Sequence, residues 1–311
     1  MSSSSSSPMQ KILVIGAGEL GTQVLTSLAH HPRLQHLSKT VLLRPSTIAS
    51  TAPAKLQELA RLRAQNINIL PGDIVHDSEA TLTHLFLPYD TIISCTGFVA
   101  GPGTQLKLTR AVLAANTPRY IPWQFGVDYD AIGRGSAQDL FDEQLDVRDL
   151  LRGEGNIATR WLIVATGMFT SFLFEPAFGV VDLERSAVCA LGGWENRVTV
   201  TAPGDIGRWT AEIVAQEEFN NRVVFVAGDT VSYGQLAEVV ERVTGHEVRR
   251  SARTVEAARQ DLVEEPGNSL FKYQVVFGEG RGVAWDVDGT WNQQVGLRGV
   301  SVEEYLKQQI G

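Results

Sequence analysis

Three glycines with a characteristic spacing follow the first apolar run of the chain. Residues 16–21 read G-A-G-E-L-G, directly after the run 11–15 (K-I-L-V-I) and before a helix-like stretch. A G-x-G-x-x-G turn between strand and helix is typical of a dinucleotide site: Gly16 permits a tight turn, Gly18 lets a pyrophosphate approach the backbone, and Gly21 lets the helix pack closely. We expect dinucleotide contacts from Gly16, Gly18, Glu19, Leu20 and Gly21. The alternative is an ordinary tight turn.

The end of the next apolar run bears on which dinucleotide binds. NAD sites place an acidic residue there to bind the ribose 2′-hydroxyl, whereas this sequence reads L-L-R-P-S-T over 42–47, with Lys55 at the start of the next predicted helix. The Arg44 guanidinium suits a 2′-phosphate, because charge-assisted contacts to phosphate are strong and often bidentate. We therefore predict NADPH or NADP+ as the cofactor, held by Arg44, Ser46 and Lys55. A solvated arginine at a strand end is the alternative.

Two more segments are expected at the same edge of the sheet, where ligands bind in open α/β folds. Residues 94–98 (S-C-T-G-F) end the fourth predicted strand, and residues 120–130 (Y-I-P-W-Q-F-G-V-D-Y-D) follow the fifth. The cofactor contacts expected from these segments are Thr96, Gly97, Phe98, Gln124 and Phe125. Trp123 and Gln124 can also line a pocket for a flat substrate. The aromatic rings of this loop can instead anchor it to the core.

A cluster of Met and Phe side chains follows the sixth predicted strand. Residues 166–174 read T-G-M-F-T-S-F-L-F. We expect Met168, Phe169 and Phe172 to form an apolar pocket for an aromatic substrate, since large apolar side chains commonly line such pockets. The alternative is that they only form the core of a smaller lobe.

These segments belong to alternating strands and helices. Short, almost continuously apolar runs alternate with helix-like stretches, which is typical of a buried parallel sheet. The expected strands are 11–15, 40–43, 67–70, 91–95, 119–121, 160–165 and 223–227. The expected helices are one ending at 29, then 54–64, 103–115, 137–152, 205–216 with Asp205 as N-cap, and 232–243. Residues 187–191 and 197–201 alternate like two strands paired around G-G-W-E-N, and short helices and loops follow 248.

We predict an α/β fold: a Rossmann-type doubly wound parallel sheet with a smaller, interleaved α+β substrate lobe. The Ser-rich residues 1–9 form a disordered tail, and residues 10–165 form the NADP-binding Rossmann domain. Residues 166–311 form the substrate lobe, with some segments returning to the Rossmann sheet.

Composition and charge exclude several classes of protein. The 311 residues are 43% hydrophobic with a formal net charge of −8, which fits a globular protein without general attraction to nucleic acid. The longest apolar stretch, 161–174, is too short and too polar to span a membrane. The two cysteines, Cys95 and Cys189, lie far apart in apolar runs and predict neither a disulfide nor a metal site. We expect a cytoplasmic monomer or homodimer that binds a small molecule.

Four features together resemble the NmrA-like, isoflavone-reductase-like branch of the atypical short-chain dehydrogenases. They are the G-A-G-E-L-G turn, L-L-R-P-S-T, Gln105 in the predicted helix 103–115, and I-P-W-Q-F-G-V-D; the resemblance extends over residues 10–245. The chain is most similar to fungal aromatic alcohol reductase-like members. The resemblance implies an oxidoreductase of secondary metabolism that uses NADPH to reduce phenylpropanoid- or isoflavonoid-like substrates. Regulatory members of the family bind the dinucleotide without known turnover.

The chain departs from the family at the catalytic residues. The family's P-S-E-F-G loop reads P-W-Q-F-G here, and its F-E-T-K-x-K-x-R helix reads F-D-E-Q-L-D-V-R, so that Gln144 replaces the catalytic lysine. No lysine lies between Lys107 and Lys272, and no Tyr-x-x-x-Lys pair occurs. A neutral amide can position a substrate oxygen but cannot act as a general acid near pH 7. The catalytic candidates are Gln144, Tyr129 and Asp128.

Three functions remain open from the sequence. The first is an NADPH-dependent reductase of an aromatic or polyketide-like small molecule. The second is an NADP-binding redox sensor or regulator without turnover, and the third is a non-redox isomerase or cyclase on the same fold. Helical periodicity turns Gln144 toward the interior. Its amide either meets a ligand there or is satisfied by the backbone.

Overall fold

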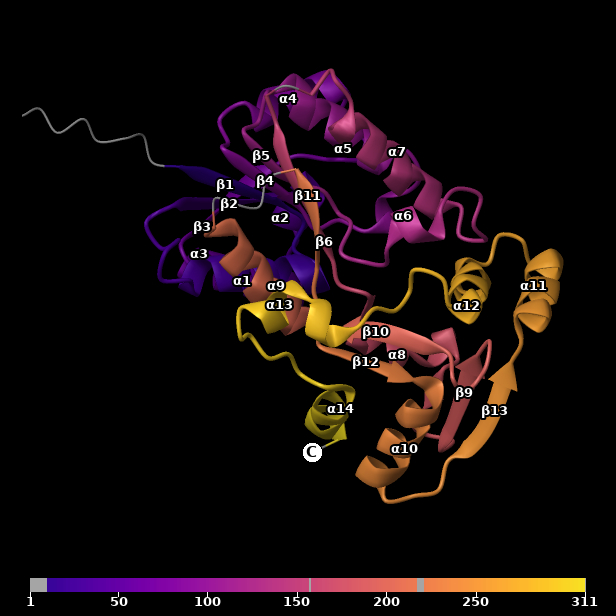
Figure 1. Cartoon of the computed structure of the whole chain (residues 1–311). Helices are drawn as coiled ribbons and strands as arrows, with labels where there is room; N and C mark the ends of the chain where they lie inside the picture. Colours follow the sequence, from indigo (N-terminus) through magenta and orange to yellow (C-terminus); the bar gives the residue numbers. More distant parts are fainter. Residues whose placement is uncertain (1–9, 157, 217–220, 311) are drawn as a thin grey trace, which may run out of the picture. The chain divides into compact units, whose positions relative to one another are not determined.

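The computed structural model describes residues 10–156, 158–216 and 221–310, and the predicted tail 1–9 lies outside them (Figure 1). The chain divides into two compact units. The first unit contains Met1–Trp123, Asp149–Leu162 and Gly207–Arg222, and the second contains Gln124–Arg148, Ile163–Ile206 and Val223–Gly311. Each unit is therefore assembled from segments that are far apart in the sequence.

A seven-stranded sheet has the strand order β11-β6-β5-β4-β1-β2-β3. Parallel pairs run from β1 to β2 and β3 on one side and from β1 through β4 and β5 to β6 on the other. The strands are β1 (Lys11–Ile15), β2 (Ser38–Leu43), β3 (Ile67–Pro71), β4 (Thr91–Ser94), β5 (Arg119–Ile121), β6 (Arg160–Ala165) and β11 (Arg222–Phe225). The strand order reverses at β1, the point where such sheets bind ligands. This topology confirms the predicted α/β, Rossmann-type fold.

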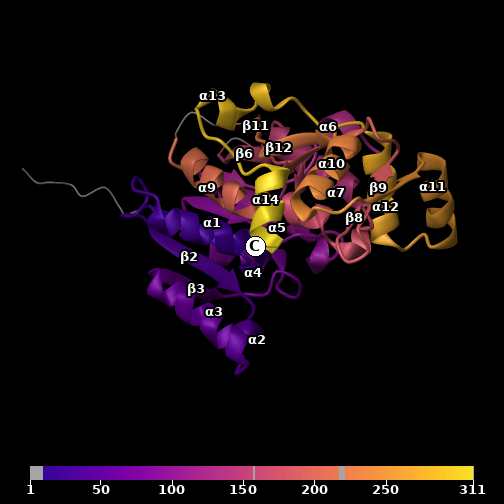
Figure 2. The ribbon, with the colours of Figure 1, turned by 90° about the horizontal axis from the view of Figure 1, so that it is seen from below.

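Helices follow the strands of the first unit. They are α1 (Glu19–His30), α2 (Pro45–Ile48), α3 (Pro53–Ala64), α4 (Glu79–Phe86) and α5 (Thr104–Ala114), with the 3-10 helix Phe98–Ala100 and most of α9 (Pro203–Val214). Figure 2 shows α1 and α9 side by side. A Cβ on Gly207 would lie 2.6 Å from the carbonyl oxygen of Gln23, so the two helices approach this closely only with glycine at that position.

Two three-stranded sheets organise the second unit. One has the order β12-β10-β7, from β7 (Met168–Phe169), β10 (Arg197–Thr201) and β12 (Asp229–Ser232). The other has the order β13-β9-β8, from β8 (Val181–Asp182), β9 (Ala187–Leu191) and β13 (Arg249–Arg253). The helices are α6 (Tyr129–Ile132), most of α7 (Leu140–Arg152), α8 (Thr170–Leu173), α10 (Tyr233–Thr244), α11 (Val255–Glu264), α12 (Ser269–Glu279), α13 (Trp291–Gln294) and α14 (Val302–Ile310), with 3-10 turns Pro176–Phe178 and Val287–Gly289.

The predicted pairing of 187–191 with 197–201 is wrong. β9 pairs with β8 and β13, whereas β10 pairs with β7 and β12. The link between them is bound to α12 instead of forming a hairpin, because Asn196 Nδ2 donates to the Phe277 carbonyl at 2.8 Å. A Cβ on Gly192 would also lie 2.1 Å from the Gly278 carbonyl oxygen. The two strands therefore leave this anchored link into different sheets.

The predicted N-cap of the helix that follows is also wrong. The helix α9 begins at Pro203, so Asp205 lies in its first turn. The Asp205 carboxylate accepts a hydrogen bond from the Val300 backbone N–H at 2.6 Å. The carboxylate therefore ties the C-terminal segment to the start of α9, a long-range role that local sequence does not reveal.

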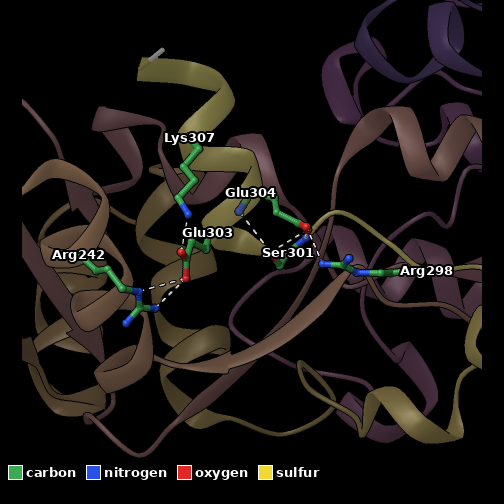
Figure 3. Close-up of polar contacts among 6 residues, drawn as sticks. All are labelled: Arg242, Arg298, Ser301, Glu303, Glu304 and Lys307. Carbon is green, nitrogen blue, oxygen red and sulfur yellow. Dashed lines mark hydrogen bonds and ion pairs between the residues drawn. The ribbon is translucent and has the colours of Figure 1, made fainter.

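Ion pairs anchor the last helix, α14, within the second unit (Figure 3). The Glu303 carboxylate accepts a hydrogen bond from Lys307 at 2.7 Å and two from Arg242 of α10 at 2.8 and 3.1 Å. These hydrogen bonds lower the pKa of the Glu303 carboxyl. Glu304 accepts from the backbone and hydroxyl of Ser301 and from Arg298. The carboxylates at the start of α14 therefore join it both to α10 and to the segment that precedes it.

Neither a membrane span nor a metal cluster is found in the part of the chain that the structure describes. No helix there combines the length and the apolar character that crossing a bilayer requires. No group of three or more His, Cys, Asp or Glu side chains there is arranged to hold a metal ion. Both cysteines are free, and Cys95 is buried.

Candidate functional site

A cavity of about 370 Å³ lies at the carboxyl ends of β1, β2 and β4 in the first unit, and we call it the first-unit cavity. Its lining residues are Ile15, Gly16, Ala17, Gly18, Leu42, Leu43, Arg44, Thr47, Lys55, Glu58, Gly72, Ile74, Val75, Thr96, Gly97 and Ala100. The strand ends thus bring together backbone from the glycine turn and charged side chains from α3. This arrangement suits a long anionic ligand.

The three glycines of the turn differ in what surrounds them. Gly16 has φ +92°, a conformation that favours glycine. A Cβ on Gly21 would lie 2.1 Å from the Gly16 carbonyl oxygen, so the packing of α1 on the turn itself requires glycine there. A Cβ on Gly18 would have no neighbour within 4 Å. Folding therefore explains Gly16 and Gly21, whereas the open side of Gly18 leaves room for a ligand beside the backbone.

The start of α1 offers backbone donors to this space. Gly18 is the N-cap of α1 and provides no side-chain hydrogen bond to the first turn. The first N–H groups of a helix have no partner within it, and the helix dipole favours negative charge at that end. The 12-residue length of α1 and its position beside the cavity therefore fit the binding of a pyrophosphate.

The other end of the first-unit cavity is charged. Arg44 directly follows β2 and is exposed, and among the described residues its guanidinium has no hydrogen-bond or ion-pair partner. Lys55 and Glu58 face the cavity from α3, where Lys55 Nζ lies 2.7 Å from Glu58 Oε2. Thr47 adds a hydroxyl. This end of the cavity therefore has one guanidinium without an ion-pair partner, that of Arg44, and one ammonium, that of Lys55, paired with the Glu58 carboxylate.

The segment after β4 is held in place by two contacts. Gln105 Nε2 of α5 donates to the Thr96 carbonyl at 2.8 Å. A Cβ on Gly97 would lie 3.1 Å from Trp123 Cζ2, and the Trp123 ring packs edge-on against Phe98 with ring centroids 4.5 Å apart. The indole of Trp123 therefore supports the cavity wall at Gly97.

The predicted cofactor contacts fall into three groups in the structure. Those that line the first-unit cavity are Gly16, Gly18, Arg44, Lys55, Thr96 and Gly97. Those in the same unit that do not line it are Glu19, Leu20, Gly21, Ser46 and Phe98. Gln124 and Phe125 are buried in the second unit. Sequence reasoning did not assign Glu58, although its position one helical turn after Lys55 was a usable signal.

A fully buried arginine organises the predicted catalytic loop in the second unit. Arg148 Nε donates to Gln124 Oε1 at 2.8 Å, and Arg148 Nη1 donates to Asp130 Oδ2 at 2.5 Å. Its guanidinium carbon also lies 5.3 Å from the centre of the Tyr129 ring. Gln124 in turn donates from Nε2 to the Gln144 carbonyl at 2.9 Å. Arg148 thus fixes the loop after β5 against the helix α7, and sequence reasoning did not assign it.

The side chain of Gln144 is fully buried and its amide is unsatisfied. Neither its oxygen nor its nitrogen has a hydrogen-bond partner among the described residues. A buried amide without partners is costly, by about 1–3 kcal/mol. Among the described residues, Gln144 is the one buried side-chain amide in which both atoms lack a partner. The expectation that Gln144 turns inward holds, whereas the alternative of an amide satisfied by the backbone does not.

The other two catalytic candidates already have structural contacts. Asp128 is the N-cap of α6 and accepts from the Ala131 backbone N–H at 3.2 Å. Tyr129 is buried, and burial raises the pKa of its hydroxyl far above the ordinary value, an effect that the nearby Arg148 guanidinium opposes. The hydroxyl of Tyr129 therefore keeps its proton at neutral pH.

Of the predicted substrate residues in the second unit, Phe172 lies within an aromatic cluster. The Phe172 ring stacks on Phe178 with centroids 4.5 Å apart and meets Tyr273 at 5.9 Å. The Tyr273 ring also contacts Phe141 at 5.9 Å between centroids, and Phe141 contacts Tyr129 at 4.9 Å. Met168 is buried on β7 and Phe169 is half-buried beside it, while Trp123 belongs to the first unit. Sequence reasoning missed Tyr273, which comes from a tail segment with no motif.

Comparisons of the chain with known proteins show its family. Residues 8–306 match the model of the NmrA-like family. An NmrA-like family domain-containing oxidoreductase of Gibberella moniliformis is 47% identical over 298 residues, covering 95% of this chain and 97% of that protein. The isoflavone reductase homolog IRL of Zea mays is 27% identical over 270 residues, covering 84% and 82%.

Solved structures share the fold. Leucoanthocyanidin reductase from Vitis vinifera, in a binary complex with NADPH, has a TM-score of 0.79 at 20% identity and covers 96% of this chain and 98% of its own. A crystal structure of isoflavone reductase has a TM-score of 0.78 at 18% identity, covering 97% and 100%. The family model and the Gibberella relative both extend over almost the whole chain, and the chain therefore belongs to the NmrA-like family.

Proposed function

We propose that this chain is an NADPH-dependent reductase of an aromatic or polyketide-like small molecule of specialised metabolism. One observation carries the proposal: in the first-unit cavity, the open backbone at Gly18 and the uncommitted guanidinium of Arg44 line the same space. The named relatives support it, since they include an oxidoreductase and an isoflavone reductase homolog. The leucoanthocyanidin reductase structure contains NADPH. We assign cofactor binding to the first unit and substrate contacts to the second.

The residues of the first unit fit NADPH. When bound, NADPH supplies a hydride to the substrate. The N–H groups at the start of α1 would hold the pyrophosphate beside Gly18, and Arg44 would hold the 2′-phosphate. Thr96 and Gly97 would lie beside the bound dinucleotide. The backbone groups among these have positions that the fold already fixes, whereas the exposed Arg44 side chain is free to turn toward the ligand.

In the second unit we assign Gln144 to substrate orientation. Its unsatisfied amide can donate to and accept from one substrate oxygen, and a neutral amide holds that oxygen without moving a proton. Arg148 holds the backbone of α7 at Gln144 through Gln124, and Tyr129 offers a neutral hydroxyl as a donor at the start of α6. Phe172 and Tyr273 are only partly buried and can offer apolar surface to a flat substrate, whereas Phe178 is fully buried beneath Phe172.

Removing the Arg44 guanidinium tests the cofactor assignment. Arg44→Ala is expected to weaken NADPH binding by about tenfold or more, because it removes a charge-assisted contact to the 2′-phosphate. NADH, which lacks this phosphate, is expected to bind almost unchanged. Fluorescence titration with both cofactors measures the two affinities. Arg61→Ala, an exposed arginine of α3 that does not line the cavity, is the control; equal losses for both cofactors contradict the assignment.

Replacing the Gln144 amide separates its functional role from its structural one. Gln144→Leu is expected to lower kcat/KM by about tenfold or more while leaving the protein equally or more stable, because it removes an unsatisfied buried amide. Asn292→Leu is the matched control for stability, since the fully buried Asn292 amide accepts from the Ala227 backbone N–H at 3.0 Å and donates to the Ala227 carbonyl at 3.0 Å, so its loss should destabilise the fold. A destabilised Gln144→Leu variant would mean that the fold satisfies this amide, and unchanged kcat/KM would mean that it does not touch substrate.

Gln144 also favours a second candidate function, an NADP-binding redox sensor without turnover. An amide at this position cannot supply the proton that a lysine can. A sensor would bind NADPH but oxidise none of it with any substrate. A non-redox isomerase or cyclase would instead change the substrate without consuming NADPH, which product mass reveals. Oxidation of NADPH by an aromatic enone or aldehyde supports the reductase.

A further inference from the structure

We propose that Glu58 sets the cofactor selectivity of the first-unit cavity, by weakening the binding of a 2′-phosphate and favouring the binding of a free ribose 2′-hydroxyl. The proposal rests on the cofactor binding proposed above. It predicts that the chain binds NADH as well as NADPH. Its preference for NADPH should be smaller than it would be if Arg44 were the only charged side chain beside the ribose.

Glu58 is the one acidic residue among those that line the first-unit cavity. It lies on α3 one turn after Lys55, and its side chain is only 24% exposed. The contact between Lys55 Nζ and Glu58 Oε2 is 2.7 Å. A carboxylate therefore occupies the charged end of the cavity, together with the two cations that a 2′-phosphate needs.

The carboxylate acts on a 2′-phosphate in two ways. The phosphate monoester is about doubly charged near neutral pH, so a carboxylate on the same wall repels it. Glu58 also holds the Lys55 ammonium, which must leave this partner or share it before it can bind phosphate. Both effects weaken NADPH binding, and Arg44 is left as the main attraction.

The same carboxylate favours the other cofactor. In sites for NAD, an acidic side chain accepts a hydrogen bond from the ribose 2′-hydroxyl. That acceptor usually ends the second strand, where this chain has Arg44. Glu58 faces the same cavity as Arg44, so it can replace the missing acceptor from α3. The competing explanation is an ordinary ion pair one turn apart on a helix, which affects neither cofactor.

Two nicotinamide-free probes test the proposal without any redox chemistry. Calorimetric titration of the full chain with 2′-phospho-ADP-ribose and with ADP-ribose compares the two ribose forms directly. Glu58→Gln is expected to tighten 2′-phospho-ADP-ribose by about three- to tenfold and to weaken ADP-ribose by about two- to fivefold. Lys55→Gln is expected to weaken 2′-phospho-ADP-ribose several-fold and to leave ADP-ribose almost unchanged.

A matched variant controls for the change in net charge. Glu79→Gln removes an exposed carboxylate in the first turn of α4, outside the cavity, and should leave the ratio of the two affinities unchanged. If Glu58→Gln shifts both probes equally, or neither, the selectivity role of Glu58 is overturned while cofactor binding stands. If the unsubstituted chain binds neither probe, the proposed cofactor site is overturned, and this role with it.

Discussion

Replacing Arg148 by methionine is expected to lower the free energy of unfolding by about 3 kcal/mol. Removal of one partner of a buried ion pair costs about 3–5 kcal/mol, because the remaining charge loses its compensation. Asp130 is 41% exposed, and water can partly solvate it, which puts the expected loss at the lower end of this range. Gln124 would also lose the donor to its side-chain oxygen. The midpoint and slope of urea unfolding measure the loss.

A second arginine in the same unit provides the control. Arg134 Nη1 lies 2.7 Å from Asp146 Oδ1, but the two side chains are 50% and 45% exposed. An exposed pair of this kind contributes about 0–1 kcal/mol, so Arg134→Met should change stability little. Similar losses for both variants would contradict the view that burial makes Arg148 the organising residue of this loop.

Gly21→Ala is expected to disrupt the turn between β1 and α1 and to abolish measurable nucleotide binding. The added Cβ would lie 2.1 Å from the Gly16 carbonyl oxygen and 3.3 Å from Cys95 Cβ, so α1 would have to move away from the strand. Overpacking of this kind costs about 1–3 kcal/mol or more. Thermal unfolding and NADPH titration of the variant measure the two effects.

Gly18→Ala is the matched variant that separates binding from folding. Its Cβ would meet nothing within 4 Å, and the Gly18 φ of −74° is open to any residue. We expect unchanged thermal unfolding of the ligand-free protein and at least tenfold weaker NADPH binding, since the methyl group would occupy the space of the pyrophosphate. Unchanged affinity would show that no ligand approaches the backbone at this point.

Local features of the fold could be predicted because neighbouring residues determine them. The turn at Gly16 and the close packing at Gly21 follow from the spacing of glycines between an apolar strand and a helix. The burial of Gln144 follows from helical periodicity in α7. The same period places Arg148 one turn later, but its partners Gln124 and Asp130 come from a distant loop, so its role was not visible in the sequence.

The prediction that β9 and β10 pair with each other was wrong for a related reason. The alternating residues of β9 and β10 identified both as strands, but partners in a sheet depend on tertiary packing more than on the strand's own residues. β13 reads R-R-S-A-R, which has no apolar pattern, yet it pairs along β9 over five residues. Contacts of the link 192–196 with α12 decided the pairing, and they lie some 80 positions apart in the chain.

The central claim is that the first-unit cavity binds NADPH for use in reduction. The most direct test is single-turnover oxidation of bound NADPH by a panel of aromatic enones and aldehydes, with binding followed by energy transfer from tryptophan. Trp123, which packs against Gly97 of the cavity wall, is well positioned to report binding. We predict saturable NADPH binding and loss of the reduced-nicotinamide absorbance with at least one substrate. Absence of NADPH binding would contradict the account.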